Sequence, residues 1–177
     1  MEKHQFQIGE RIVYGNRGVC LIEDIRTLDF AQDKNRLYYV LKPTANPNST
    51  FYTPVTSEQR KEEMRYALSK EEIDELLTRL RGKRMKWIDD RNGRAASFHD
   101  ILSGREQEPL IMMAGCIYAR REELRKKNKK LSVSDENVLH AAEKRISEEF
   151  GLTLEMSETE VGEYIRRSLE ADVCEAK

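Results

Sequence analysis

The segment from Lys83 to Arg94 carries the residue types best suited to nucleic-acid chemistry. It reads Lys-Arg-Met-Lys-Trp-Ile-Asp-Asp-Arg-Asn-Gly-Arg and holds the chain's single tryptophan among five basic residues. An indole can stack on a base or insert at a distorted minor-groove step, while neighbouring cations hold phosphates. The alternative is an indole packed in the core beside solvated cations. The candidate DNA-contacting residues are Trp87, Lys83, Arg84, Lys86, Arg91 and Arg94.

A second basic stretch runs from Arg120 to Lys130. We expect an ordinary helix end there, where cations offset the helix dipole, with a phosphate-binding patch as the alternative. Residues 79–130 carry fifteen Lys and Arg against seven Asp and Glu, a local charge of +8. Residues 131–177 carry five against twelve, a local charge of −7. The middle of the chain therefore suits phosphates better than its end does.

Catalytic chemistry is a weaker reading of the same sequence. No phosphate-cradling glycine loop or nucleophile elbow is present. Adjacent glutamates such as Glu148-Glu149 are expected on solvated helix faces. We predict no enzymatic activity, metal, cofactor or small-molecule substrate. The histidines and cysteines show neither metal-ligand nor disulfide spacing, and the cysteines are expected to be reduced and buried: His4, His99, His140, Cys20, Cys116 and Cys174.

The N-terminal part has the pattern of short strands. Alternating or β-branched runs at 8–14, 19–25, 37–41 and 50–55 are separated by Gly, Asn, Asp and Pro turns. This pattern predicts a small antiparallel barrel. An unpaired edge of such a sheet could accept a strand from another protein, or the chain's own loops could cover it.

After about Ser57 the hydrophobic period changes to that of helices. Ser-x-x-Glu capping boxes at Ser69 and Ser157 predict two helix starts, and Asp90 and Pro109 lie near two more. A further helix is expected from a Ser134 cap to Gly151. The predicted fold is therefore α+β in two parts, a β-barrel domain at 1–67 and a helical domain of about five helices at 68–177.

The composition is that of a charged, surface-rich protein. Charged residues make up 36% of the 177 residues, and the net charge is −1. No apolar run approaches the ~20 residues that span a bilayer, so we expect no membrane interaction. The N-terminus has no apolar signal-peptide core, which predicts a cytoplasmic location.

The opening strands resemble those of the CarD family. The resemblance is carried by the pattern Phe6-x-Ile8-Gly9-Glu10-x-Ile12-Val13-Tyr14-x-x-x-Gly18-Val19 and then Tyr38-Tyr39-Val40-Leu41-Lys42. It looks like the polymerase-interacting domain that this family shares with transcription-repair coupling factor. The resemblance continues through Trp87 and Leu131-Ser132 and covers nearly the whole chain.

The resemblance implies a bacterial transcription regulator. A Tudor-like barrel would bind the RNA polymerase β subunit by strand pairing. The helical domain would contact promoter DNA at the upstream edge of the bubble, largely without sequence specificity. Trp87 would wedge into the minor groove and stabilise the open complex. The candidate polymerase-contacting residues are Tyr38, Tyr39, Phe51, Tyr52 and Pro54.

The sequence departs from the family at three places. Asp89-Asp90 follows the tryptophan where some members have basic residues, and Asp135-Glu136-Asn137 replaces a basic cluster. Leu28 and Tyr52 stand where some relatives use arginine towards the polymerase. Acids near DNA would weaken phosphate binding, so polymerase docking is favoured over the DNA contact. The alternatives are a polymerase-binding adaptor without a DNA contact and an RNA- or ribosome-binding barrel protein.

Overall fold

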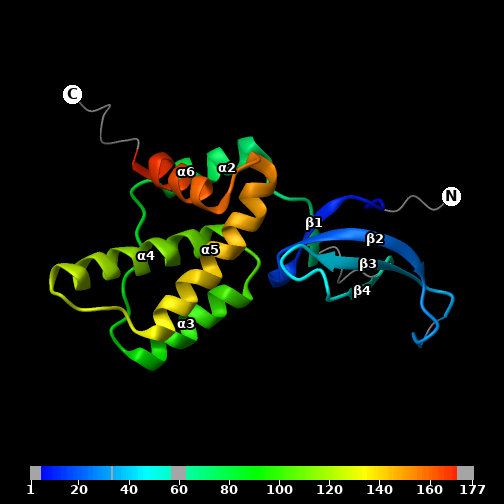
Figure 1. The fold of residues 1–177 in the computed structure, drawn as a ribbon, viewed down its shortest axis with the longest axis horizontal. Coiled ribbons are helices and arrows are strands. Elements are labelled where there is room, and N and C mark those ends of the chain that lie inside the picture. Colours follow the sequence, from blue (N-terminus) through cyan, green and yellow to red (C-terminus); the bar gives the residue numbers. More distant parts are fainter. Residues whose placement is uncertain (1–4, 33, 57–62, 171–177) are drawn as a thin grey trace. The chain divides into compact units, whose positions relative to one another are not determined.

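The computed structural model describes residues 5–32, 34–56 and 63–170. The chain forms two compact units, Met1–Ala67 and Leu68–Lys177. The first unit is built from strands and the second from helices (Figure 1). Each unit has a hydrophobic core of its own. The predicted α+β fold in two parts is therefore confirmed.

The first unit is a five-stranded antiparallel sheet with the order β4-β3-β2-β1-β5. It is an open sheet and not the closed barrel that we expected, since β4 and β5 end the strand order in the described part of the chain. A short 3₁₀ turn, η1, joins the first two strands. The elements are β1 (Arg11–Tyr14), η1 (Gly15–Arg17), β2 (Val19–Thr27), β3 (Leu37–Pro43), β4 (Phe51–Pro54) and β5 (Met64–Arg65).

Strand β5 falls in a stretch that the sequence predicted to be helical. It pairs with β1 through Val13–Arg65 and Tyr14–Met64, so the helix expected after Ser57 is wrong at residues 64 and 65. Two residues are too few to show a hydrophobic period, which is why the pattern missed this strand. Residues 57–62 lie outside the described residues.

Side chains on β3 and β4 alternate between the two faces of the sheet. Tyr39 lies opposite Thr53 and Leu41 opposite Phe51, on the face that holds the core. Tyr38 lies opposite Pro54 and Val40 opposite Tyr52, on the other face. Because successive strand residues point to opposite faces, the five predicted polymerase-contacting residues are divided between the two sides.

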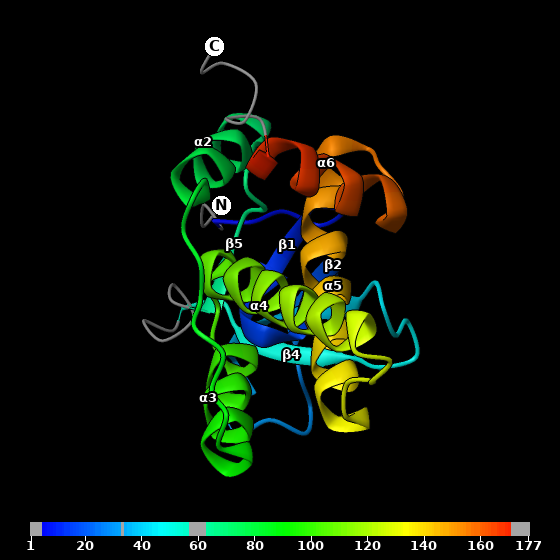
Figure 2. The same cartoon turned by 90° about the vertical axis from the view of Figure 1, so that its left-hand side faces the viewer.

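The second unit contains five helices in its described part. Helices α2 and α6 lie side by side at one end, α3 lies at the other, and α5 connects the two ends (Figures 1 and 2). None of the described helices is both long and apolar enough to cross a membrane. The helices are α2 (Lys70–Leu80), α3 (Arg91–Ser103), α4 (Gln107–Lys126), α5 (Val133–Leu154) and α6 (Glu158–Glu170).

Polar caps begin most of these helices where the sequence predicted. Ser69 and Glu72 form the reciprocal capping box of α2, and Ser157 and Glu160 exchange the same bonds before α6. The start of α5 differs, because its cap is Ser132, whose Oγ accepts from the Asp135 N–H at 3.1 Å, and not Ser134. Two serines two residues apart gave the sequence no means of choosing between them.

Helix α5 also continues three residues beyond its predicted end at Gly151. It ends at Leu154, and Glu155 takes the left-handed conformation with φ 54°. A Cβ on Gly151 would lie 2.8 Å from the Met156 carbonyl oxygen. The glycine therefore allows the chain to fold back against the helix, and it does not end the helix.

Glu149 is buried, although the sequence predicted a solvated helix face. Its side chain accepts from the Leu68 N–H at 3.0 Å and from Gln107 Nε2 at 2.5 Å, and the residue is 2% exposed. Thr153 Oγ1 donates to the Leu68 carbonyl at 2.7 Å. These bonds attach the first residue of the helical unit to α5. Adjacent helix residues point about 100° apart, so one acid of the pair can face inward.

Candidate interfaces at Trp87 and at strand β4

Trp87 lies in an irregular segment, residues 83–89, between α2 and α3. Gly82, with φ 72°, follows the end of α2, and Asp90 caps α3 by accepting from the Gly93 N–H at 2.6 Å. Within the segment Met85 and Trp87 pack against the helical core, while Arg84 and Lys86 are exposed. This alternation of period two is that of an extended chain.

Three side chains surround the Trp87 indole. The Phe98 ring meets it edge-on at a centroid distance of 6.2 Å. The guanidinium carbons of Arg94 and Arg120 lie 4.5 and 5.4 Å from the ring centroid, within cation–π distance. Trp87 is half-buried, so its ring is neither sealed in the core nor free in solvent.

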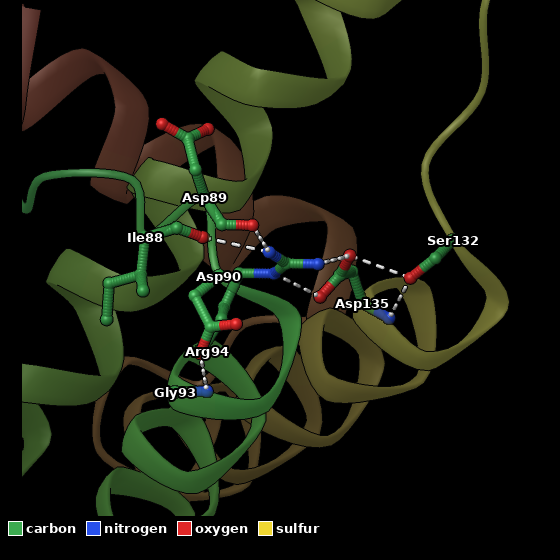
Figure 3. A network of polar contacts seen from close by, with 7 residues as sticks. All are labelled: Ile88, Asp89, Asp90, Gly93, Arg94, Ser132 and Asp135. Carbon is green, nitrogen blue, oxygen red and sulfur yellow. Dashed lines mark hydrogen bonds and ion pairs between the residues drawn. The ribbon is translucent and has the colours of Figure 1, made fainter.

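Arg94 is not placed to contact a phosphate. The residue is 8% exposed, and its Nε and Nη2 donate to the two carboxylate oxygens of Asp135 at 3.0 and 3.2 Å. Its Nη1 donates to the carbonyls of Ile88 and Asp89 at 2.8 and 3.3 Å (Figure 3). In this structure Arg94 is engaged by Asp135 and by the two carbonyls, and its predicted DNA contact stays an untested prediction.

Asp135 completes the network from the first turn of α5. Ser132 Oγ donates to its carboxylate at 2.7 Å (Figure 3). Burial acts to raise the pKa of Asp135, but the hydrogen bonds from Arg94 and Ser132 outweigh it, so the pKa lies below its ordinary value. Asp135 is thus the ion-pair partner of Arg94.

The other predicted DNA-contacting cations differ in their surroundings. Lys83 lies 3.5 Å from Glu108, which also pairs with Arg79 at 3.1 Å. Arg84, Lys86 and Arg91 are exposed and make no ion pair with another described residue. These three cations are therefore the ones best placed to meet a phosphate.

The second basic stretch comprises the end of α4 and the connection to α5. Helix α4 ends at Lys126, within the stretch where the sequence predicted a helix end, and residues 125–130 are all exposed. Arg120, from the same stretch, lies over the Trp87 ring. Arg121 reaches Glu136 of α5, at 3.8 Å. Trp87 and Arg120 are 33 residues apart in the sequence. Their contact therefore brings the two basic segments together in the folded helical unit.

Strand β4 presents an exposed aromatic pair on the sheet face opposite the core. Tyr52 is 39% exposed, and its ring meets that of Phe30 edge-on at 5.3 Å. Phe30, in the connection between β2 and β3, is 73% exposed. Tyr38 and Pro54 lie on the same face and are partly exposed. One side of the β4 backbone has no strand partner in the described part of the chain.

The remaining two predicted polymerase-contacting residues lie on the core face. Tyr39 is fully buried, packs edge-on against Phe6 and accepts from the Phe6 N–H through its hydroxyl at 3.3 Å. The ring is part of the sheet core in this structure, and the predicted polymerase contact of Tyr39 stays an untested prediction. Phe51 is half-buried, with the Arg17 guanidinium carbon 4.2 Å from its ring centroid.

The sequence of the first unit matches a known protein family. A family model described as the CarD-like/TRCF RID domain covers residues 6–66. The N-terminal unit is a CarD-like domain. This confirms the resemblance seen in the opening strands and gives the protein a transcription-related function that involves RNA polymerase. The CarD-like family is non-enzymatic. No curated protein matches the chain.

The CarD-like match ends before the helical unit begins. Its last residue is Tyr66, whereas the helical unit starts at Leu68. The described residues contain no group of three or more His, Cys, Asp or Glu side chains that could hold a metal ion. The helical unit has a shallow groove with mostly apolar walls, lined by Met85, Ile101, Glu106, Glu108, Pro109 and Met112. Its two acids would repel a phosphate.

Three residues of these sites were missed by sequence reasoning. Phe30 is an apolar residue near a polar turn, and that contrast was a usable signal. Asp135 and Arg120 carried no usable signal, because their roles depend on partners 41 and 33 residues away. From the sequence, Asp89 and Asp90 were expected to weaken DNA binding. In the structure Asp90 is the N-cap of α3.

Proposed function

We propose that this protein is a bacterial, cytoplasmic transcription regulator that docks on the RNA polymerase β subunit and stabilises the promoter open complex. The observation that carries the proposal is the CarD-like match over the whole sheet unit, residues 6–66. The helical unit would contact promoter DNA at the upstream edge of the bubble, beside Trp87.

The docking surface of the CarD-like domain would be strand β4 and its outer face. A strand at the edge of a sheet can add to a strand of a partner protein, and β4 ends the strand order in the described part of the chain. The exposed Phe30–Tyr52 pair supplies apolar rings of the kind that dominate binding energy at protein interfaces. Tyr38 and Pro54 extend the same face, whereas Tyr39 supports it from the core.

The DNA contact would combine the Trp87 ring with the exposed cations Arg84, Lys86 and Arg91. Contacts to phosphates fix position without reading sequence, so binding would be largely independent of sequence. Stacking on an aromatic side chain contributes ~1–3 kcal/mol per base. An effect of that size would shift an opening equilibrium by roughly tenfold to a hundredfold.

The test separates the two contacts within the full-length protein. Tyr52→Ala should weaken binding to a polymerase β fragment by roughly tenfold, because interface aromatics contribute ~1–2 kcal/mol or more. Trp87→Ala should leave that binding unchanged and shorten open-complex lifetime on a weak promoter by roughly tenfold, by loss of a stacking contact. Ile8→Ala, at an exposed apolar residue of the sheet unit, is the control for the first variant.

Two results would contradict the proposal. If the double variant Tyr52→Ala, Phe30→Ala binds the polymerase β fragment as tightly as wild type, the proposed docking surface is wrong. If Trp87→Ala leaves the open-complex lifetime unchanged, the proposed DNA contact of Trp87 is wrong. Tyr118→Ala, at an exposed aromatic residue of the same helical unit, shows whether loss of any aromatic ring produces the second effect.

A polymerase-binding adaptor without a DNA contact is the second candidate. It is favoured by the packing of Trp87 against Phe98 and the helical core. In an adaptor, added promoter DNA would leave the emission of Trp87 unchanged. In the proposed regulator, DNA would quench or shift that emission.

A further inference from the structure

Arg94 connects the three parts of the chain that meet at Trp87. Its guanidinium lies over the indole, and its Nη1 donates to the carbonyls of the two residues that follow Trp87. Its Nε and Nη2 hold the Asp135 carboxylate of α5 in a bidentate pair (Figure 3). One buried side chain thus contacts the ring, the backbone beside it and a neighbouring helix.

The backbone around Trp87 has little other support. Residues 83–89 belong to no helix or strand, so no regular hydrogen-bond ladder fixes them. A planar guanidinium with donors in fixed directions sets geometry as well as energy, because two parallel bonds to a carboxylate allow one orientation. Arg94 therefore restrains an otherwise irregular segment at Ile88 and Asp89.

A gain in folding stability does not by itself explain why the Arg94–Asp135 ion pair is buried. The side chains of Arg94 and Asp135 are 10% and 9% exposed. Desolvation offsets much of the attraction in a buried pair, and apolar residues of similar size often serve stability as well. A packed apolar side chain would not, however, hold the two carbonyls after Trp87.

We propose that Arg94, oriented by Asp135, is a positioning residue that sets the orientation of the Trp87 ring. This inference rests on the proposed function, since the ring is positioned for the promoter DNA contact. A ring held in its bound orientation loses less conformational entropy when it inserts, which strengthens binding without an added contact. Arg120 contributes a second cation near the same ring.

The experiment compares Asp135→Asn with Asp74→Asn in the full-length protein. Asp135→Asn leaves the Arg94 charge buried without its counter-ion, while the ring and the exposed cations remain. Asp74→Asn is the matched control, because Asp74 also pairs with a cation, Lys70 at 2.7 Å, and accepts from Tyr164 of another helix. Arg94→Lys is the second variant, since one ammonium cannot span the carboxylate and both carbonyls.

Two quantities are measured for each variant. The first is acrylamide quenching of the emission of Trp87, the chain's single tryptophan. The second is the Kd for a promoter fragment with a forked, partly unpaired end. Asp135→Asn and Arg94→Lys should raise the quenching constant about twofold and weaken DNA binding roughly fivefold, the scale of lost preorganisation. Asp74→Asn should change neither.

The positioning role would be overturned if Asp135→Asn and Arg94→Lys keep their helical circular dichroism and show the same acrylamide quenching constant for Trp87 as wild type. If Asp135→Asn does not fold, Arg94→Lys decides in its place. If both fail to fold, exchange of the Arg94 Nε–H in the wild-type protein decides, and exchange as fast as that of Arg120 would overturn the inference. The proposed function fails separately, when wild type and Trp87→Ala bind the forked DNA equally.

Discussion

At Asp135 a single buried carboxylate accepts hydrogen bonds from an arginine and from Ser132, the serine that caps its helix. It accepts from Arg94 and Ser132 through its side chain, and its N–H donates to Ser132 Oγ. The structure thus uses this acid for an internal ion pair, at a position where the resemblance to the CarD family led us to expect weaker DNA binding. Neither Arg94 nor Asp135 shows a pattern in its own sequence neighbourhood that predicts the pair.

The lowered pKa of Asp135 predicts a stability difference that depends on pH. Its folded pKa lies below the ordinary value of 3.8, so the ionised form stabilises the folded state. That contribution is fully present above about pH 5 and is lost as the pH falls through the folded pKa. Urea unfolding should therefore show wild type more stable than Asp135→Asn at pH 7, with the difference shrinking below about pH 4.

The control for that measurement is Asp100→Asn, which removes one negative charge from an exposed position of α3. A difference between wild type and Asp135→Asn that stays constant from pH 7 to pH 3 would contradict the prediction. It would mean that the carboxylate adds no stability through its ionised form.

At the scale of the element, two glycines inside helices have opposite environments. A Cβ on Gly151 of α5 would lie 2.8 Å from a backbone oxygen, that of Met156. A Cβ on Gly115 of α4 would meet nothing within 4 Å. Alanine is the better helix former at an unobstructed site, so the same substitution should act in opposite directions in the two helices.

Gly115→Ala should stabilise the helical unit by ~0.5–1 kcal/mol, because alanine loses less backbone entropy in a helix. Gly151→Ala should destabilise it by ~1–3 kcal/mol, because the chain that folds back at Met156 must move. Urea unfolding followed by helical circular dichroism measures both. If Gly151→Ala stabilises the helical unit, the chain at Met156 moves away from the new Cβ without lowering the free energy of unfolding.

The helices illustrate what local sequence can predict. Capping boxes and apolar stripes depend on residues three and four apart, so the starts of α2, α3 and α6 were predictable. The end of α5 was not, because Gly151 has the residue type of a helix end but serves a close contact with Met156. Burial of Glu149 depends on Leu68, 81 residues away, and could not be predicted locally.

At the scale of the whole molecule, the described cores of the two units share no residue. Tyr39 and Leu41 belong to the sheet core, whereas Leu77 and Phe150 belong to the helical core. The change from a period of two to a period of 3.6 made this organisation predictable, because each period is a local property. The open form of the sheet depends on strand pairing and was not predictable from the same pattern.

Separate cores predict that residues 1–67 and 68–177 fold as independent fragments. Each keeps its own apolar contacts, so the helical fragment should retain its helical circular dichroism and melt within a few degrees of the full chain. The fragment 1–67 should retain β-fragment binding, since it contains the CarD-like domain. An unfolded 68–177 fragment would show that the first unit supports the second.

The described part of each unit also contains one buried thiol. Cys20 lies in the sheet and is fully buried, and Cys116 lies in α4 and is 8% exposed. Burial raises the pKa of the Cys116 thiol, so that it is less nucleophilic even when a reagent reaches it. Alkylation of each cysteine must await local opening around it. With Cys174 replaced by serine, mass spectrometry of the two labelled peptides would report how often each half of one intact molecule opens.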